Sequence, residues 1–245
     1  MPAMKLASKY EIDAVRKRVV ALLEDAWPRS FEQWLRFHAE VDVIRNLHEA
    51  ASDRLIGGKL FTDRVPEPAA AVRIARDFDI PSVLPFAYYT LAGIPLSNEW
   101  DKCHTSPEEL WGLAVGFGRV ARWRLLDVVD MGRVLGYREE LTLLTTSNTN
   151  WVSSAVVKSV LSAAAQDCLG GLDPCSGKAE AIRALWMKNV SSSWWNSAYP
   201  DPLSVMQSVY EGHLLWDLCE LCEVAVKKCI RERQEAVWEA CLGAM

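Results

Sequence analysis

The sequence lacks the features of a membrane-spanning or secreted protein. No apolar run approaches the roughly 18 residues that a membrane span requires, and the start at Met1 has no apolar stretch typical of a secretory signal. We therefore expect an intracellular protein, cytoplasmic or nuclear, with no membrane partner. In that setting its seven cysteines are expected to be reduced thiols or metal ligands rather than disulfides.

An excess of basic residues is also missing. The 27 lysines and arginines are outnumbered by 32 aspartates and glutamates, which gives a formal net charge of -5. Surfaces that bind nucleic acid normally carry a basic excess, because they neutralise phosphate groups. The charge balance therefore argues against a nucleic-acid partner.

Recognisable catalytic motifs are absent as well. The sequence has no H-E-x-x-H metal motif, no phosphate-binding P-loop and no G-x-S-x-G nucleophile turn. Gly116–Ala121 matches the dinucleotide-binding pattern G-x-G-x-x-A, but a capped helix beginning near Ser106 precedes it where a strand is needed. Cys103 and His104 are adjacent, so they do not form a thiol–imidazole pair in the usual geometry. We predict a non-enzymatic protein with no catalytic and no cofactor-binding residues.

The pattern of apolar residues is helical throughout. No stretch shows the alternation of apolar and polar residues that marks a half-buried strand. Half of the 245 residues are hydrophobic, which is enough for a sizeable core. We predict an all-α fold, an irregular helical bundle built from helix–corner–helix units, with no substantial sheet.

One ten-residue pattern occurs twice, at Leu6–Val15 and at Ile74–Val83. Each copy reads aliphatic, Ala, two polar residues, aromatic, acid, Ile, two residues that suit a helix start, and Val. The acid and the Ile interrupt the helical spacing, after which Asp13 or Pro81 suits the start of a new helix. Each copy predicts a helix, a tight corner and a second helix, although amphipathic helices also resemble one another by chance.

The segment after the first copy predicts an amphipathic helix over Val15–Trp27, which Pro28 ends. Ser30, with Gln33 three residues later, predicts a capped start for the next helix. The apolar residues of the first of these helices are expected to form a buried stripe that consists of Val15, Val19, Leu22, Leu23 and Ala26.

A polar segment, Thr145–Asn150, separates two regions of the chain. Before it, Trp123–Leu144 is typical of one helix, or of two helices with a break near Gly136. We predict a helical domain over residues 1–145, which contains both corners. A helical C-terminal region over residues 146–245 follows and is marked by its cysteines and tryptophans.

The C-terminal region carries the candidate metal ligands. Cys168 and Cys175 lie in a stretch rich in Gly, and Cys219 and Cys222 lie three apart on a predicted helix, where both sulfurs face one side. Four thiolates suit Zn²⁺, and a site closed by four cysteines favours a structural role over catalysis. Apolar packing of buried thiols, or redox chemistry, would explain the same residues.

Several short segments occur in a distinctive order. Leu6–Ile12 reads L-A-S-K-Y-E-I, Trp27-Pro28 follows, Val83–Leu91 reads V-L-P-F-A-Y-Y-T-L, and Gly136–Leu141 reads G-Y-R-E-E-L. This order resembles the helical region after the BTB/POZ domain in a large group of fungal, mainly mushroom-type (basidiomycete), proteins. In that group the patterns are L-x-x-A-x-K-Y-x-I, W-P, L-P-x-A-x-Y-x-L and G-R-E-x-L.

The resemblance implies a protein-interaction module. In that group a sheet-containing BTB core precedes this region, and the resemblance here covers the helical part that follows it. The implied function is that of an adaptor related to ubiquitin-ligase assemblies, with an unidentified protein as its partner. The alternative that the residues themselves suggest is a small helical domain stabilised by structural zinc.

Overall fold

The computed structural model describes residues 13–105, 107–116, 119–148, 159–160, 175, 184, 201–212 and 218–242. Within these residues the chain is mostly helical, and its extended pairings are two isolated bridges, Ile56 with Lys59 and Glu99 with Ala121. The prediction of an all-α fold without a substantial sheet is confirmed for this part of the chain. Its α-helices are α2 (Asp13–Ala26), α3 (Phe31–Ala50), α4 (Pro68–Asp77), α5 (Leu84–Ala92), α6 (Trp100–Thr105), α7 (Pro107–Gly116), α8 (Val128–Asn148), α11 (Pro202–Tyr210) and α12 (Glu220–Leu242).

Three short 3-10 turns connect some of these helices: η1 (Phe61–Asp63), η2 (Pro81–Val83) and η3 (Trp123–Leu125). Each turn precedes an α-helix by a few residues and changes the direction of the chain. None of the described helices combines the length and the apolar character that crossing a bilayer requires.

The chain divides into two compact units, residues 1–138 with Met245, and residues 139–244. The division falls inside α8, whereas the sequence predicts a boundary at residue 145. α8 passes through both Gly136 and Thr145 without a break, so the one-helix alternative for this segment is confirmed. A glycine inside a helix costs only about 1 kcal/mol relative to alanine, which neighbouring helix-forming residues can offset.

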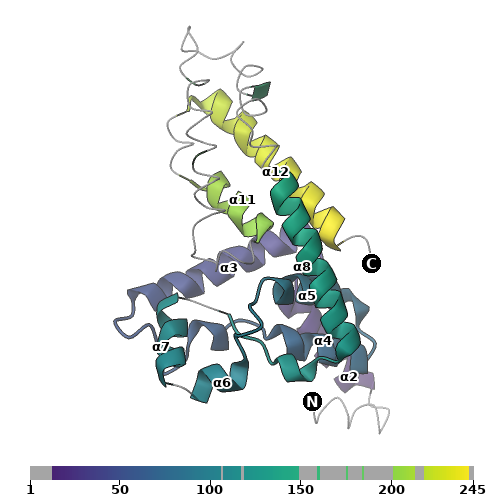
Figure 1. Cartoon of the computed structure of the whole chain (residues 1–245). Coiled ribbons are helices and arrows are strands. Elements are labelled where there is room, and N and C mark those ends of the chain that lie inside the picture. The colour runs from purple at the N-terminus through teal and green to yellow at the C-terminus, as the bar shows by residue number, and fades with distance from the viewer. Residues whose placement is uncertain are drawn as a thin grey trace. The chain divides into compact units, whose positions relative to one another are not determined.

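α5 is the apolar centre of the first unit, and α4 packs beside it (Figure 1). Every residue from Phe86 to Ala92 is buried, as expected of a helix that is apolar on all sides. The Phe86 ring lies 6.0 Å from that of Trp27, 5.6 Å from that of Phe37 and 5.7 Å from that of Tyr89. Such ring pairs add about 1 kcal/mol each beyond the area they bury. They join the end of α2 and the middle of α3 to α5.

The second copy of the repeated pattern forms a helix, a corner and a helix. α4 ends at Asp77, Asp79 has a left-handed φ of 54°, and η2 leads into α5. Aspartate is one of the few residues other than glycine that enter this backbone region readily. Arg16 of α2 donates a hydrogen bond to the carbonyl of Phe78 at 3.1 Å, which ties α2 to the corner. In the first copy, Leu6–Ile12 lies outside the described residues.

The connection between α2 and α3 is only partly as predicted. Ser30 caps α3, because its hydroxyl oxygen accepts a hydrogen bond from the Gln33 N–H at 3.3 Å. Trp27 and Trp34, each 2% exposed, anchor the turn in the core. The predicted buried stripe on α2 is wrong, since α2 contains no buried residue and Leu22 is 54% exposed. Helical spacing identifies an apolar face but does not show whether another element covers it.

A buried carboxylate joins α4, α5 and α8 within the first unit. Asp130 accepts a hydrogen bond from the Tyr88 hydroxyl at 2.6 Å and pairs with Arg76 at 2.7 Å. Arg76 also pairs with Asp127 at 2.7 Å, whose carboxylate accepts the backbone N–H groups of Val129 and Asp130 in the first turn of α8. Burial and the hydrogen bond to Asp130 raise the pKa of Tyr88 to about 12. The Asp130 charge is therefore compensated on two sides, as a buried charge requires.

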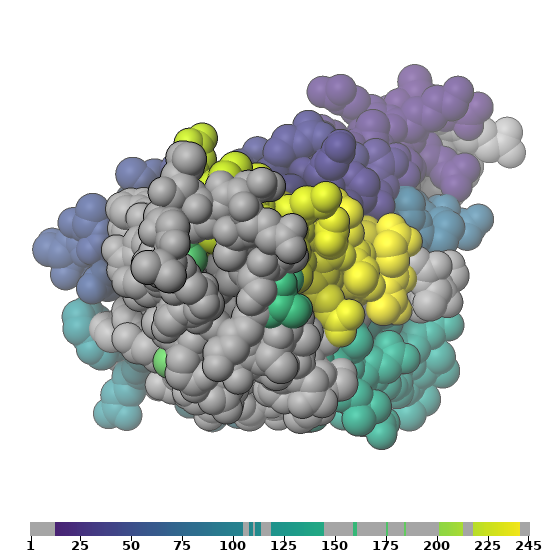
Figure 2. All heavy atoms as spheres, turned by 90° about the horizontal axis from the view of Figure 1, so that it is seen from above, coloured from purple at the N-terminus to yellow at the C-terminus, as the bar shows by residue number. Residues whose placement is uncertain are grey.

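In the second unit, α11 lies beside α12 (Figure 1). Between them the buried Gln234 amide donates to the Leu203 carbonyl at 3.2 Å and to the Gln207 amide oxygen at 3.1 Å. Arg231 donates to both amide oxygens, at 3.1 Å to Gln207 and at 2.8 Å to Gln234. Part of α12 is visible at the surface (Figure 2). On this helix Val224 is 59% exposed.

Candidate functional site

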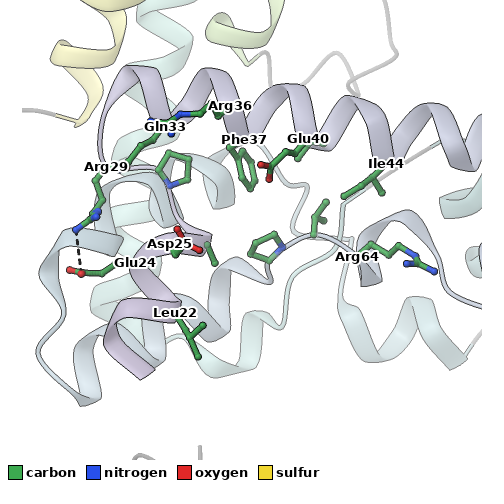
Figure 3. A pocket seen from close by; sticks show the side chains of 15 residues that line it. Leu22, Glu24, Asp25, Arg29, Gln33, Arg36, Phe37, Glu40, Ile44 and Arg64 are labelled. Atoms are coloured by element: carbon green, nitrogen blue, oxygen red, sulfur yellow. Dashed lines mark hydrogen bonds and ion pairs between the residues drawn. The ribbon is translucent and has the colours of Figure 1, made fainter. Parts of the chain in front are cut away.

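The first unit contains an open groove between α2, α3 and residues 64–66, which we call the α2–α3 groove (Figure 3). Its volume is about 440 Å³, within the range of pockets that bind small ligands or single side chains of a partner. The apolar part of its lining consists of Leu22, Ala26, Pro28, Phe37, Val41, Ile44, Val65 and Pro66.

The floor of the groove is held by the core beneath it. The Phe37 ring meets that of Phe86 edge to face, at an interplanar angle of 83°. Val65 is 7% exposed, and Val41 and Ile44 of α3 pack against the cluster that it forms with Phe61. Because these side chains are fixed by packing, the groove is preformed rather than dependent on a ligand for its shape.

Charged side chains surround this apolar floor. Glu24 pairs with Arg29 at 3.3 Å and accepts a hydrogen bond from the Ser82 hydroxyl at 2.7 Å, so its charge is already compensated. Asp25 and Glu40 also line the groove. Figure 3 shows Glu40 extending from α3 toward the space that α2 borders on the other side.

The carboxylates of Asp25 and Glu40 have no hydrogen-bond or ion-pair partner within the described part of the chain. Arg36, on the rim, likewise has no such partner there. Arg64 lines the groove too, and its hydrogen bond goes to the backbone carbonyl of Ile56. The groove thus offers two carboxylates and two guanidinium groups without an ion pair in the described part of the chain, around an apolar floor. A ligand that combines apolar groups with a cation would match this arrangement.

The second unit brings together three of the four cysteines that the sequence nominates as metal ligands. The sulfur atoms of Cys175, Cys219 and Cys222 all lie within 4.8 Å of one another. Cys222 and Cys175 are buried, and Cys219 is partly exposed. Cys168, the fourth predicted ligand, lies outside the described residues.

The position of the pair on α12 follows from the local sequence. The Cys219 carbonyl accepts the backbone N–H of Glu223 at 2.9 Å, so Cys219 is the residue that precedes the first turn of α12. Cys222 lies three residues later, so that both side chains project to the same side. Burial, followed by the thiols of Cys219 and Cys175, raises the pKa of Cys222. Without a bound cation this thiol therefore stays protonated.

Cys103 and His104 do not form a thiol–imidazole pair. The His104 ring nitrogens lie 2.8 Å from the Trp100 carbonyl and 2.9 Å from the Asp63 carboxylate, so neither faces the Cys103 sulfur. Burial raises the pKa of Cys103 to about 11, which keeps this thiol protonated at neutral pH. The glycine-containing pattern at residues 116–121 follows the helix α7, as the sequence predicts, and not a strand.

The α2–α3 groove was not predicted from the sequence, because the apolar stripe of α2 was expected to be buried. It also did not reveal the buried Asp130, since no local pattern distinguishes this residue from the exposed Asp127. No protein-family model, curated protein or solved structure matches the chain.

Proposed function

We propose that this protein is a non-enzymatic interaction module whose α2–α3 groove binds a protein segment that carries apolar side chains and a lysine or arginine. The observation that carries this proposal is the uncovered apolar face at Leu22, beside a preformed apolar floor. Leaving a leucine side chain in water forgoes about 1.5–3 kcal/mol that burial would supply. Because Leu22 is 54% exposed, a partner segment that covers it would recover about half of this free energy.

The charges around the groove support a cationic residue in the partner. A lysine or arginine that enters between Asp25 and Glu40 would compensate two open carboxylates. Partly exposed ion pairs contribute about 0.2–1 kcal/mol each, so the charges would select the partner and its orientation more than they would set the affinity. The apolar contacts would supply most of the binding free energy.

The resemblance to the region after fungal BTB/POZ domains supports the same role. An adaptor needs a surface that binds a second protein, and it needs no catalytic residues of its own. In this proposal the α2–α3 groove binds the partner protein. Any link to a ubiquitin-ligase assembly is made by other components of that assembly. Binding at the groove can therefore be tested independently of the wider adaptor function.

The test is a selection of short random peptides displayed on phage against the full chain. Selected peptides are then synthesised and titrated by fluorescence anisotropy. Leu22→Glu should weaken binding about tenfold or more, since it removes the apolar contact and adds a charge. Val43→Glu is the matched control, because Val43 is 59% exposed on α3 and does not line the groove.

Two outcomes would contradict the proposal. One is a selection that enriches no peptide. The other is a set of peptides whose affinity is the same for wild type and Leu22→Glu, or which Val43→Glu weakens equally. An excess of lysine and arginine among the selected peptides is the expected signature of Asp25 and Glu40.

A further inference from the structure

The thiol cluster joins two segments that are distant in the sequence. Cys175 precedes Cys219 by 44 residues (219 minus 175), yet their sulfur atoms, with that of Cys222, lie within 4.8 Å of one another. All three are free cysteines. Helix geometry alone places two thiols three residues apart on the same side of a helix. The third thiol lies beside them because of the tertiary fold.

The spacing of the sulfur atoms is close to that of a metal centre. Zinc–sulfur bonds are about 2.3 Å long, so two sulfurs of a tetrahedral zinc site lie about 3.8 Å apart. A limit of 4.8 Å therefore requires each sulfur to move by no more than about 1 Å, which side-chain rotation can supply. A disulfide would instead require a sulfur–sulfur distance near 2.05 Å between two of them.

The electrostatic surroundings favour the thiolate form of one of the three cysteines, Cys219. Cys219 lies at the N-terminus of α12, where the unpaired backbone N–H groups carry partial positive charge. Cys222 is fully buried, so its thiolate form needs a cation in direct contact. A bound divalent ion satisfies this need, and soft sulfur ligands suit Zn²⁺.

We propose that Cys175, Cys219 and Cys222 bind a thiophilic divalent metal ion, Zn²⁺ in the cell, which fastens the turn at Cys175 to the first turn of α12. The ion takes the place of the three thiol protons, and a ligand other than these three side chains completes its coordination. The buried position of two of the three cysteines makes the centre structural. This inference is independent of the α2–α3 groove, which belongs to the other unit.

Metal analysis of the full chain, purified under reducing conditions, tests the proposal. Wild type should contain about one zinc per chain, the stoichiometry of a single structural site. Cys175→Ser, Cys219→Ser and Cys222→Ser should each lose most of it. Cys229→Ser is the matched control, because Cys229 lies on α12 but outside the cluster, and it should retain the wild-type content.

A second measurement keeps the test decisive if a serine variant fails to fold or if zinc is lost during purification. The reduced, metal-free wild-type chain is titrated with Co²⁺, and sulfur-to-cobalt charge-transfer absorption is recorded. Saturation at about one equivalent, reversed by Zn²⁺, supports the site. The absence of this absorption in wild type, or equal metal content in wild type and Cys222→Ser, would overturn the proposal and leave apolar packing of thiols as the explanation.

Discussion

In the first unit, described helices meet through large aromatic rings and an ion pair whose carboxylate is buried, whereas in the described part of the second unit α11 and α12 meet through hydrogen-bonded amides and a tyrosine ring that faces basic side chains of α12. Trp27, Phe37 and Phe86 represent the first kind of contact, and Gln207 and Gln234 the second. Ring pairs bury large apolar areas and prefer edge-to-face or offset-stacked arrangements. Amide hydrogen bonds hold only while both helices keep their positions.

This difference explains where each candidate site lies. α2 is joined to the aromatic core around α5 at its end, through Trp27, while Leu22 remains 54% exposed and the groove stays open to a partner. The amide contacts between α11 and α12 depend on alignment, and the proposed metal lies apart from them, at the start of α12. Substitutions in the two units are expected to affect stability and binding to different degrees.

Trp34→Ala should destabilise the first unit by about 3–5 kcal/mol, because it removes a ring that is 2% exposed and leaves a cavity. Urea unfolding followed by circular dichroism measures the change. Trp111→Ala is the control, since Trp111 is 59% exposed and its loss should change stability by no more than about 0.5 kcal/mol. Equal losses from both variants would show that the core is not centred on α5.

Asp130→Ala should cost about 3 kcal/mol, because it leaves the Tyr88 hydroxyl without its acceptor and Arg76 without its buried partner. Asp77→Ala, which removes an exposed pair with Arg73 on α4, should cost less than about 1 kcal/mol. Both are measured by urea unfolding. If Asp130→Ala were neutral, the buried ion pair would not distinguish the first unit from the second.

Alkaline pH should weaken the first unit through Tyr88. The pKa of this group rises from about 10 in the unfolded chain to about 12 in the folded one. The stabilisation is complete below pH 10 and is lost as pH rises toward 12, a change of about 2–3 kcal/mol. Unfolding measured at several alkaline pH values in wild type and Tyr88→Phe isolates this contribution, which should be missing from the variant. Parallel pH curves for the two proteins would refute it.

Gln234→Ala should cost about 1–3 kcal/mol, because the Leu203 carbonyl loses its amide donor in a buried position. Hydrogen exchange of the backbone amides of α11 and α12 reports the loosening directly. Glu235→Ala is the neighbouring control, since Glu235 is exposed on α12. Unchanged protection in Gln234→Ala would show that contacts other than the Gln234 amide hold the two helices.

Glu40→Gln should have the smallest effect, a loss of about 0.5–1 kcal/mol in the binding of peptides that contain lysine or arginine, without a change in stability. Anisotropy titration at low and high salt measures it, and the difference between the two proteins should shrink as salt screens the charge. Glu32→Gln, exposed on the same helix but outside the groove, should bind as wild type does. A salt-independent difference would mean that Glu40 acts through packing rather than charge.

Local signals in the sequence were sufficient for the starts of α3 and α7. Ser30 caps α3, and α7 begins at Pro107, directly after Ser106, because these residues suit the first turn of a helix. The polar segment that begins at Thr145 does not interrupt α8, which continues to Asn148. Threonine and serine weaken a helix only slightly.

The helical class, the corner at Asp79 and the choice of Cys175, Cys219 and Cys222 as candidate ligands were all predictable from residue spacing. They depend on interactions between residues a few positions apart. The exposure of Leu22, the burial of Asp130 against Arg76 and the approach of Cys175 to α12 became visible in the folded chain alone. Each of these depends on which distant segments come together, and the free energy of that choice is spread over many contacts that no local pattern contains.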